Sequence, residues 1–206
     1  MNVDPKHAAE LQERIEKALK DEEPCTAVEL LAARVTQEDC SGRTWFDYGD
    51  SLFAVGRLIE AQKALLMARN LAPLKQQFSV DARLGMVASS MGSSDAERCF
   101  ALAVQSSECP GWVWILRAVN LIKLESIELA RECLTIAKER GNIDLDEVLV
   151  NEALIERHAS NYVLAAEYAE AALQIDPESI PARQILASIA GAADVQRYIR
   201  SLSVKH

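Results

Sequence analysis

Alanine recurs along this chain at an interval close to 34 residues. The recurring positions, separated by 34, 35, 34 and 35 residues, are Ala27, Ala61, Ala96, Ala130 and Ala165. A second row follows the last four of them by seven residues, at Ala68, Ala103, Ala137 and Ala172. Because seven residues are close to two turns of an α-helix, both rows are predicted to lie on one helix face. Such a period is typical of a stack of helical repeats, in which each unit completes the core of its neighbours.

The residues around the second unit carry a resemblance to a known family. Their order along the chain is Trp45, Tyr48, Gly49 and Leu52, followed by Ala61, Leu65, Ala68 and Pro73. Trp114 starts the same pattern again, with Ala118 and Leu121 at similar offsets. The pattern resembles the tetratricopeptide repeat, in which Trp, Leu-Gly and Tyr precede Ala, Phe and Pro. The resemblance implies an all-α fold, a right-handed α-solenoid of antiparallel helix pairs.

The phase of the rows predicts about five repeats followed by a C-terminal cap. The expected repeats cover about 8–41, 42–75, 76–110, 111–144 and 145–177, and the cap covers 178–206. We expect the cap to be a helix pair that is broken at Gly191, with Val195, Tyr198 and Ile199 on the apolar side of its last helix. Since no flexible linker interrupts the chain, a single superhelical domain is predicted over residues 1–206.

Charge and composition narrow the classes of partner. Lys and Arg number 22 and Asp and Glu number 31, which gives a net charge of −9 and disfavours nucleic acid. The first residues lack the apolar core of a secretory signal, and no apolar run is long enough to cross a bilayer. We therefore expect a cytoplasmic protein that does not bind membranes. The five cysteines show no CxxC spacing and no neighbouring histidine, so no metal site is expected.

Catalytic motifs are absent from the sequence. It contains no Gly-rich phosphate loop, no G-x-S-x-G turn and no H-E-x-x-H spacing. Glu152 and Glu156 lie one helical turn apart, and carboxylates at this spacing are typical of a solvated face. We therefore expect a protein that is not an enzyme, with no catalytic residues and no cofactor.

The resemblance also implies an inner, concave wall built from the first helix of each repeat. The candidate partner-binding residues on this wall are Phe46, Asp50, Phe53, Met86, Ile115, Val119, Ile122, Val150, Leu154 and Arg157. The centre of the wall is apolar, and each Val, Leu or Ile left in water forgoes about 1.5–3 kcal/mol. Two alternatives follow: a partner covers these residues, or tight curvature of the superhelix buries them inside the protein.

These observations favour a non-enzymatic adaptor or scaffold. Its groove would hold a peptide or an amphipathic helix of another protein, with acidic ends flanking an apolar centre. A narrower version is a chaperone for a hydrophobic secretion or assembly client. The alternative from another class is an architectural subunit that forms a homo-oligomer through the apolar groove or the terminal helix. A monomer whose mass does not change with concentration would exclude this last reading.

Overall fold

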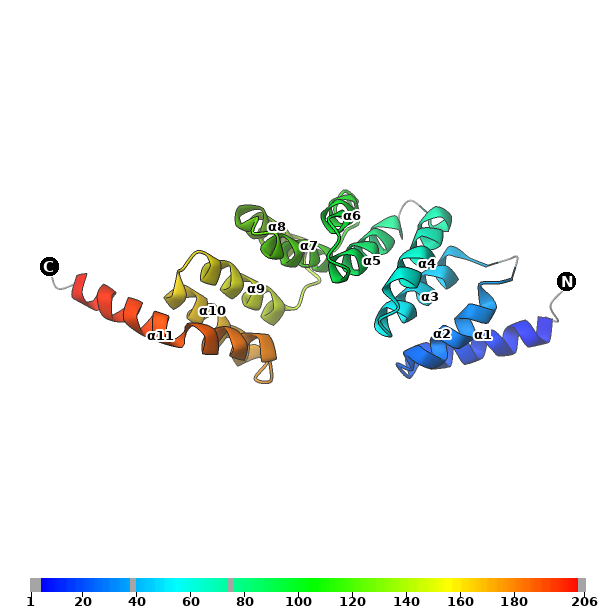
Figure 1. Ribbon diagram of the computed structural model, residues 1–206, viewed down its shortest axis with the longest axis horizontal. Helices are drawn as coiled ribbons and strands as arrows, with labels where there is room; N and C mark the ends of the chain where they lie inside the picture. Colours follow the sequence, from blue (N-terminus) through cyan, green and yellow to red (C-terminus); the bar gives the residue numbers. More distant parts are fainter. Residues whose placement is uncertain (1–4, 38–39, 74–75, 204–206) are drawn as a thin grey trace. The chain divides into compact units, whose positions relative to one another are not determined.

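The computed structural model describes residues 5–37, 40–73 and 76–203, and this part of the chain is helical without strands (Figure 1). The helices are α1 (Pro5–Lys20), α2 (Pro24–Arg34), α3 (Gly42–Ala54), α4 (Leu58–Leu71), α5 (Gln77–Ser90), α6 (Asp95–Ala103), α7 (Gly111–Lys123), α8 (Ile127–Arg140), α9 (Leu145–His158), α10 (Tyr162–Ile175) and α11 (Ile180–Ser203). Consecutive helices pack as antiparallel pairs, from α1 with α2 to α9 with α10. Each pair coincides with one predicted repeat, so the prediction of an all-α array of helix pairs is confirmed.

The chain divides into two compact units, Met1–Glu108 and Cys109–His206. Unit 1 contains α1 to α6, and its second helices pack on the first helices of the pairs that follow them. Unit 2 contains α7 to α11 and is built in the same way, with α8 on α9 and α10 on α11. Each unit has its own apolar core. The single superhelical domain over residues 1–206 stays a prediction.

The alanine rows form the contact surface inside each helix pair. Ala61 and Ala68 have no exposed surface, and the other alanines of both rows are at most 3% exposed. Opposite them, Gly49 approaches so closely that an added Cβ would lie 2.7 Å from Cγ of Leu65. At Gly85 an added Cβ would lie 2.8 Å from the ring of a buried phenylalanine. Small residues are needed at these positions because the backbone of one helix lies against side chains of its paired helix.

The turn within each pair uses one residue in the left-handed region. These residues, with φ between 53° and 78°, are Glu22, Gly56, Gly92, Glu125 and Ser160. The following residue donates its N–H to the carbonyl five positions earlier, as from Ser126 to Leu121 at 2.9 Å. This pattern, a Schellman motif, satisfies a carbonyl that the end of the first helix leaves free. Glycine adopts this conformation without penalty, whereas glutamate and serine are strained there.

The C-terminal cap is one continuous helix, so the break predicted at Gly191 is wrong. Helix α11 runs through this glycine, which is exposed and has no atom within 4 Å of an added Cβ. A glycine in a helix interior costs only about 1 kcal/mol, which a 24-residue helix tolerates. Val195 is 58% exposed, and the side chains of Tyr198 and Ile199 lie outside the described residues.

Gln196 holds the distal half of α11 against the preceding pair. Its Nε2 donates to the carbonyl oxygen of Ser160 at 2.6 Å, and its Oε1 accepts from the N–H of Val163 at 3.3 Å. The bond from Val163 satisfies one of the backbone N–H groups that lack partners in the first turn of α10, and the bond to Ser160 holds the preceding turn. The long helix is therefore fastened to unit 2 beyond the point where a turn was expected.

We expect Glu125→Gly to stabilise the protein. The substitution removes the left-handed strain of a non-glycine residue, and after the greater flexibility of glycine in the unfolded chain is subtracted, a gain of about 0.5–1 kcal/mol remains. Urea denaturation followed by circular dichroism measures the change. Glu132→Gly, on an exposed position within α8, is the matched control and should instead cost about 1 kcal/mol. A lower midpoint for Glu125→Gly would contradict the prediction.

Two glycine-to-alanine substitutions should have opposite effects. A Cβ on Gly111, the first residue of α7, would lie 2.4 Å from the carbonyl oxygen of Ala137 and 2.5 Å from that of Gly141. Because both are backbone atoms, Gly111→Ala should lower the free energy of unfolding by about 1–3 kcal/mol. Gly191→Ala meets open space and should raise it by about 0.5–1 kcal/mol. Thermal melts of both variants beside the wild type check the signs, and two shifts in one direction would refute this account.

Candidate functional site

The predicted wall residues of unit 1 lie on two neighbouring first helices. Phe46, Asp50 and Phe53 occupy successive turns of α3, and Met86 lies on α5, which contacts α3. All four side chains are partly buried. Both phenylalanines pack against the core of unit 1 and keep part of their surface exposed. The structure therefore brings these four predicted residues together on the neighbouring first helices α3 and α5.

Arg83 of α5 links three of the wall residues. Its Nε lies 2.8 Å from Oδ1 of Asp50, and its guanidinium carbon lies 5.8 Å from the centroid of the Phe53 ring. Its Nη1 donates to Sδ of Met86 at 3.5 Å. A guanidinium over an aromatic face is favourable, and the carboxylate neutralises its charge. Arg83 thus fixes the spacing of α3 and α5 and adds a polar group to an apolar wall.

Arg43 of α3 also contacts both an aromatic ring and a carboxylate. Its guanidinium carbon lies 5.8 Å from the centroid of the Phe46 ring, and its Nε lies 2.9 Å from Oδ1 of Asp47. Burial raises the pKa of Asp47, and Arg43 opposes that rise. The sequence analysis missed both arginines. Their signal was the spacing, since each arginine precedes a wall residue, Phe46 or Met86, by three positions and therefore shares its helix face.

In unit 2, half of the predicted wall residues are interior. Ile115, Ile122 and Val150 are 0%, 6% and 8% exposed. Ile115 and Ile122 belong to a core that also contains Val148 and Ile155 of α9. The isoleucines are buried because α7 packs against both α8 and α9, and Val150 of α9 belongs to the core formed with α10 and α11. In the structure these three side chains are therefore buried by other residues of unit 2.

The remaining predicted residues of unit 2 are partly exposed. Val119 and Leu154 pack against the core with one side and leave the other accessible. Arg157 is partly buried, and its Nη1 donates to Oγ of Ser188 on α11 at 3.4 Å. A partner-binding role for the ten wall residues stays a prediction; their partly exposed apolar members are Phe46, Phe53 and Met86 in unit 1 and Val119 and Leu154 in unit 2.

The solvated face predicted for Glu156 is wrong. Its side chain is only 4% exposed, and Oε1 lies 2.7 Å from Nη1 of Arg131 on α8, while Oε2 accepts from Nδ2 of Asn161 at 2.8 Å. Burial alone would raise the pKa of Glu156, but the hydrogen bonds from Asn161 and Arg131 outweigh it and lower the pKa. Glu152, one turn earlier, pairs with Lys138 of α8 at 2.5 Å. Both carboxylates therefore join α8 to α9.

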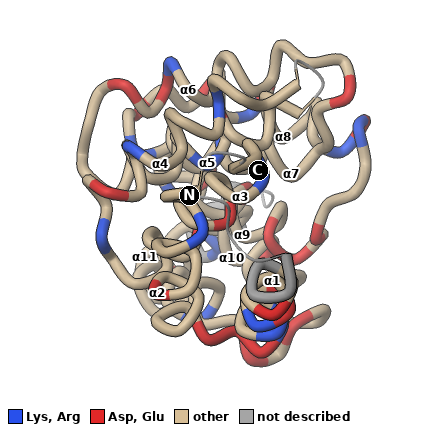
Figure 2. The backbone as a smooth tube through the Cα atoms, turned by 90° about the vertical axis from the view of Figure 1, so that its right-hand side faces the viewer, with Lys and Arg blue, Asp and Glu red and all other residues tan. Residues whose placement is uncertain are grey.

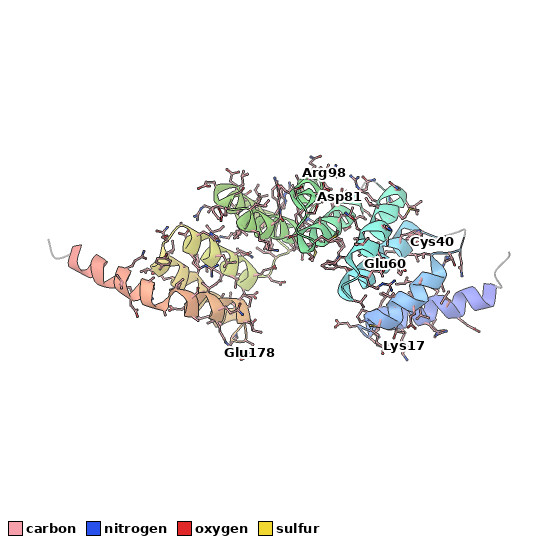
Figure 3. All side chains as sticks on the ribbon, viewed as in Figure 1. Lys17, Cys40, Glu60, Asp81, Arg98 and Glu178 are labelled. Atoms are coloured by element: carbon pink, nitrogen blue, oxygen red, sulfur yellow. The ribbon has the colours of Figure 1, made fainter. Side chains whose placement is uncertain are left out.

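Unit 1 has an ion pair of the same kind between neighbouring repeats. Nε of Arg69, on α4, lies 2.5 Å from Oδ1 of Asp81 on α5. Asp81, labelled in Figure 3, is only 5% exposed. Burial raises the pKa of this carboxyl, and Arg69 opposes the rise. Buried carboxylates thus connect a second helix to the following first helix in both units.

We expect Glu156→Gln to destabilise unit 2 by about 2 kcal/mol at neutral pH, because it replaces charged hydrogen bonds with weaker ones. The pKa of Glu156 is lower in the folded protein than its usual 4.5, so this contribution is complete above pH 4.5. It is lost as the pH falls through the folded-state value. Urea denaturation at several pH values should therefore show the gap between wild type and variant closing in acid.

The matched control is Glu152→Gln on the same helix. Because Glu152 is 17% exposed against 4% for Glu156, the loss of its charge should cost less than about 1 kcal/mol. Equal losses for the two variants, or a gap for Glu156→Gln that does not depend on pH, would contradict this account of the buried pair.

No helix in the described part of the chain has both the length and the apolarity needed to cross a bilayer. No protein-family model matches the chain, and no curated protein matches its sequence. Solved structures do match it. PilF of Pseudomonas aeruginosa superposes with a TM-score of 0.70 at 20% identity, over 84% of this chain and 78% of that one. YrrB, a tetratricopeptide-repeat protein, gives a TM-score of 0.63 at 14% identity, over 82% of this chain and 87% of that one.

A chain of the APC/C hetero-tetramer Cut9–Hcn1 also superposes with a TM-score of 0.70 at 20% identity. The match covers 84% of this chain but only 34% of that one, so the present chain spans about a third of that relative. At these identities the likeness concerns the fold alone. Together with the helix pairs and their buried alanine rows, it shows that the chain has the tetratricopeptide-repeat fold.

Proposed function

We propose that this chain is a non-enzymatic protein-interaction module that binds a peptide or an amphipathic helix of a partner along the inner wall of unit 1. The observation that carries the proposal is the partly exposed row of Phe46, Phe53 and Met86 on α3 and α5. Apolar side chains gathered on one side of a domain are typical of an interaction surface. Arg83, held among them, gives the wall a polar group that can orient a bound segment.

The geometry suits a segment of the partner that presents apolar side chains at helical or extended spacing. Rings and a thioether adapt to several shapes, and each apolar side chain that they bury contributes about 1.5–3 kcal/mol. Because Asp50 already neutralises Arg83, the wall does not require a charged group opposite the guanidinium. Binding would therefore depend mainly on apolar contact.

The similar structures add support at the level of the fold. YrrB is described as a tetratricopeptide-repeat protein with an unusual peptide-binding site, and the Cut9 chain was solved in an assembly with Hcn1. A fold does not fix an activity, so this support is an analogy and the wall itself carries the proposal.

Self-association is the second candidate, and one surface of unit 2 favours it. Leu145 begins α9, Ile175 ends α10 and Ile180 begins α11, so the antiparallel packing places all three at one end of the unit. Their exposed fractions are 52%, 49% and 65%. An isologous contact between two such ends would bury them in a homodimer. Sedimentation over a wide range of concentrations tests this candidate, and a constant monomer mass excludes it.

We expect Met86→Lys to weaken partner binding at least about tenfold without unfolding the protein. The substitution places a charge among Phe53, Arg83 and the apolar wall, where it faces a guanidinium of the same sign. Affinity capture from a lysate of the source organism, followed by mass spectrometry, should show the partner recovered with wild type and reduced at least about tenfold with the variant, a loss of about 1.4 kcal/mol or more.

Met67→Lys is the control, because this methionine lies on α4 and is 44% exposed. It introduces the same charge and should leave capture unchanged. Circular dichroism must show equal helicity for both variants. If Met86→Lys and Met67→Lys recover equal amounts of the partner, the wall of unit 1 is ruled out as the binding surface.

A further inference from the structure

An apolar pocket lies next to the wall of unit 1, where α1, α2 and α3 come together. It has a volume of about 350 Å³ and a floor formed by Ala18, Leu19, Pro24, Ala27 and Ala54. Leu19 is 36% exposed, so part of this floor faces solvent. A pocket of this size accommodates one long side chain of a bound segment.

Carboxylates form the rim of the pocket. Glu22, Glu23 and Asp50 line it together with the apolar floor. Glu22 and Glu23 are exposed, and no ion pair to either is found among the described residues. Asp50 is shared with Arg83, and no lysine or arginine is among the residues that line the pocket. The lining therefore carries negative charge, while Figure 2 shows both acidic and basic positions along α1, whose last turn contains Lys17 and Lys20.

The helix ends around the pocket add to this potential. Both α1 and α3 end beside it, and the C-terminus of a helix carries a partial negative charge. The start of α2 opposes them, but its first residue is Pro24, which has no N–H to offer. Glu23 is the N-cap residue of α2 and makes no side-chain capping bond. The Glu23 carboxylate therefore does not cap α2.

We propose that the partner segment bound by unit 1 is basic, and that one of its lysine or arginine side chains occupies this pocket. The methylene stem packs on the apolar floor while the cationic head reaches Glu22, Glu23 and Asp50, as amphipathic side chains do. Asp50 belongs to both the pocket and the wall, so one segment can contact Phe53 with an apolar side chain and the pocket with a basic one. This inference rests on the proposed function.

A selection with the full chain and a display library of random peptides tests the inference. Peptides selected on the wild type should be enriched in Lys or Arg next to apolar residues. The double variant Glu22→Gln, Glu23→Gln should lose this enrichment. The control, Glu167→Gln with Glu170→Gln, makes the same change in net charge at exposed positions of α10 and should keep it.

Fluorescence anisotropy with one selected lysine-containing peptide makes the comparison quantitative. Its affinity for the double variant should be about fivefold weaker than for the wild type, since exposed charge pairs contribute modestly. Replacing the lysine of the peptide by norleucine should remove the difference between the two proteins. Ala54→Met, which fills part of the pocket without changing the charge, should also lower the affinity for the peptide. If the double variant loses helicity, Ala54→Met takes its place in the comparison.

The outcomes separate the pocket from the wall. Peptides that lack basic enrichment but lose binding to Met86→Lys would overturn the pocket inference and leave the proposed function standing. An equal loss for the control double variant would also overturn it, because net charge alone would then explain the effect. A library that yields no binder to the wild type would overturn both proposals.

Discussion

The close approach of the two helices in each repeat is the constraint on which the rest of the structure depends. Ala61 and Ala68 are fully buried at this contact, and Gly49 leaves the space that Leu65 fills. A larger residue in either row would separate the helices, and the following first helix would then lose the surface on which it packs. Phe53 follows Gly49 by about one turn of α3 and packs partly against the core of unit 1, so the proposed wall borders the contact that holds the repeat together.

Much of the fold follows from the sequence because the period reports a contact that every repeat must make. The period does not report contacts between repeats. Glu156 looked solvated because its partner Arg131 lies 25 residues away on another helix. The continuity of α11 through Gly191 depends on Gln196, whose bonds reach back to the preceding pair. Ile115 could not be assigned to wall or core, because apolar residues cover most of α7 and the sequence does not say which of them α9 contacts.

The buried ion pairs between repeats differ in how burial and hydrogen bonding balance at the carboxyl. Glu156 accepts from Arg131 and Asn161, and these bonds outweigh its desolvation. At Asp81 burial outweighs the interaction with Arg69, and the pKa of this carboxyl is raised. Both pairs join a second helix to the next first helix, but at different ends, since Arg69 lies in the last turn of α4 and Arg131 near the start of α8. Acid therefore affects them differently, since protonation removes a favourable interaction from Glu156 but partly relieves the burial of Asp81.

The turns within the helix pairs affect how the chain folds. Each turn closes with bonds among residues of its own pair, so two helices can dock as soon as about 34 residues are available. Within each unit, the contacting helices are neighbours or next neighbours in sequence. Low contact order of this kind favours rapid folding that can begin at any pair and spread along the array. An emerging chain can thus bury its apolar seams in order of synthesis, without waiting for a distant segment.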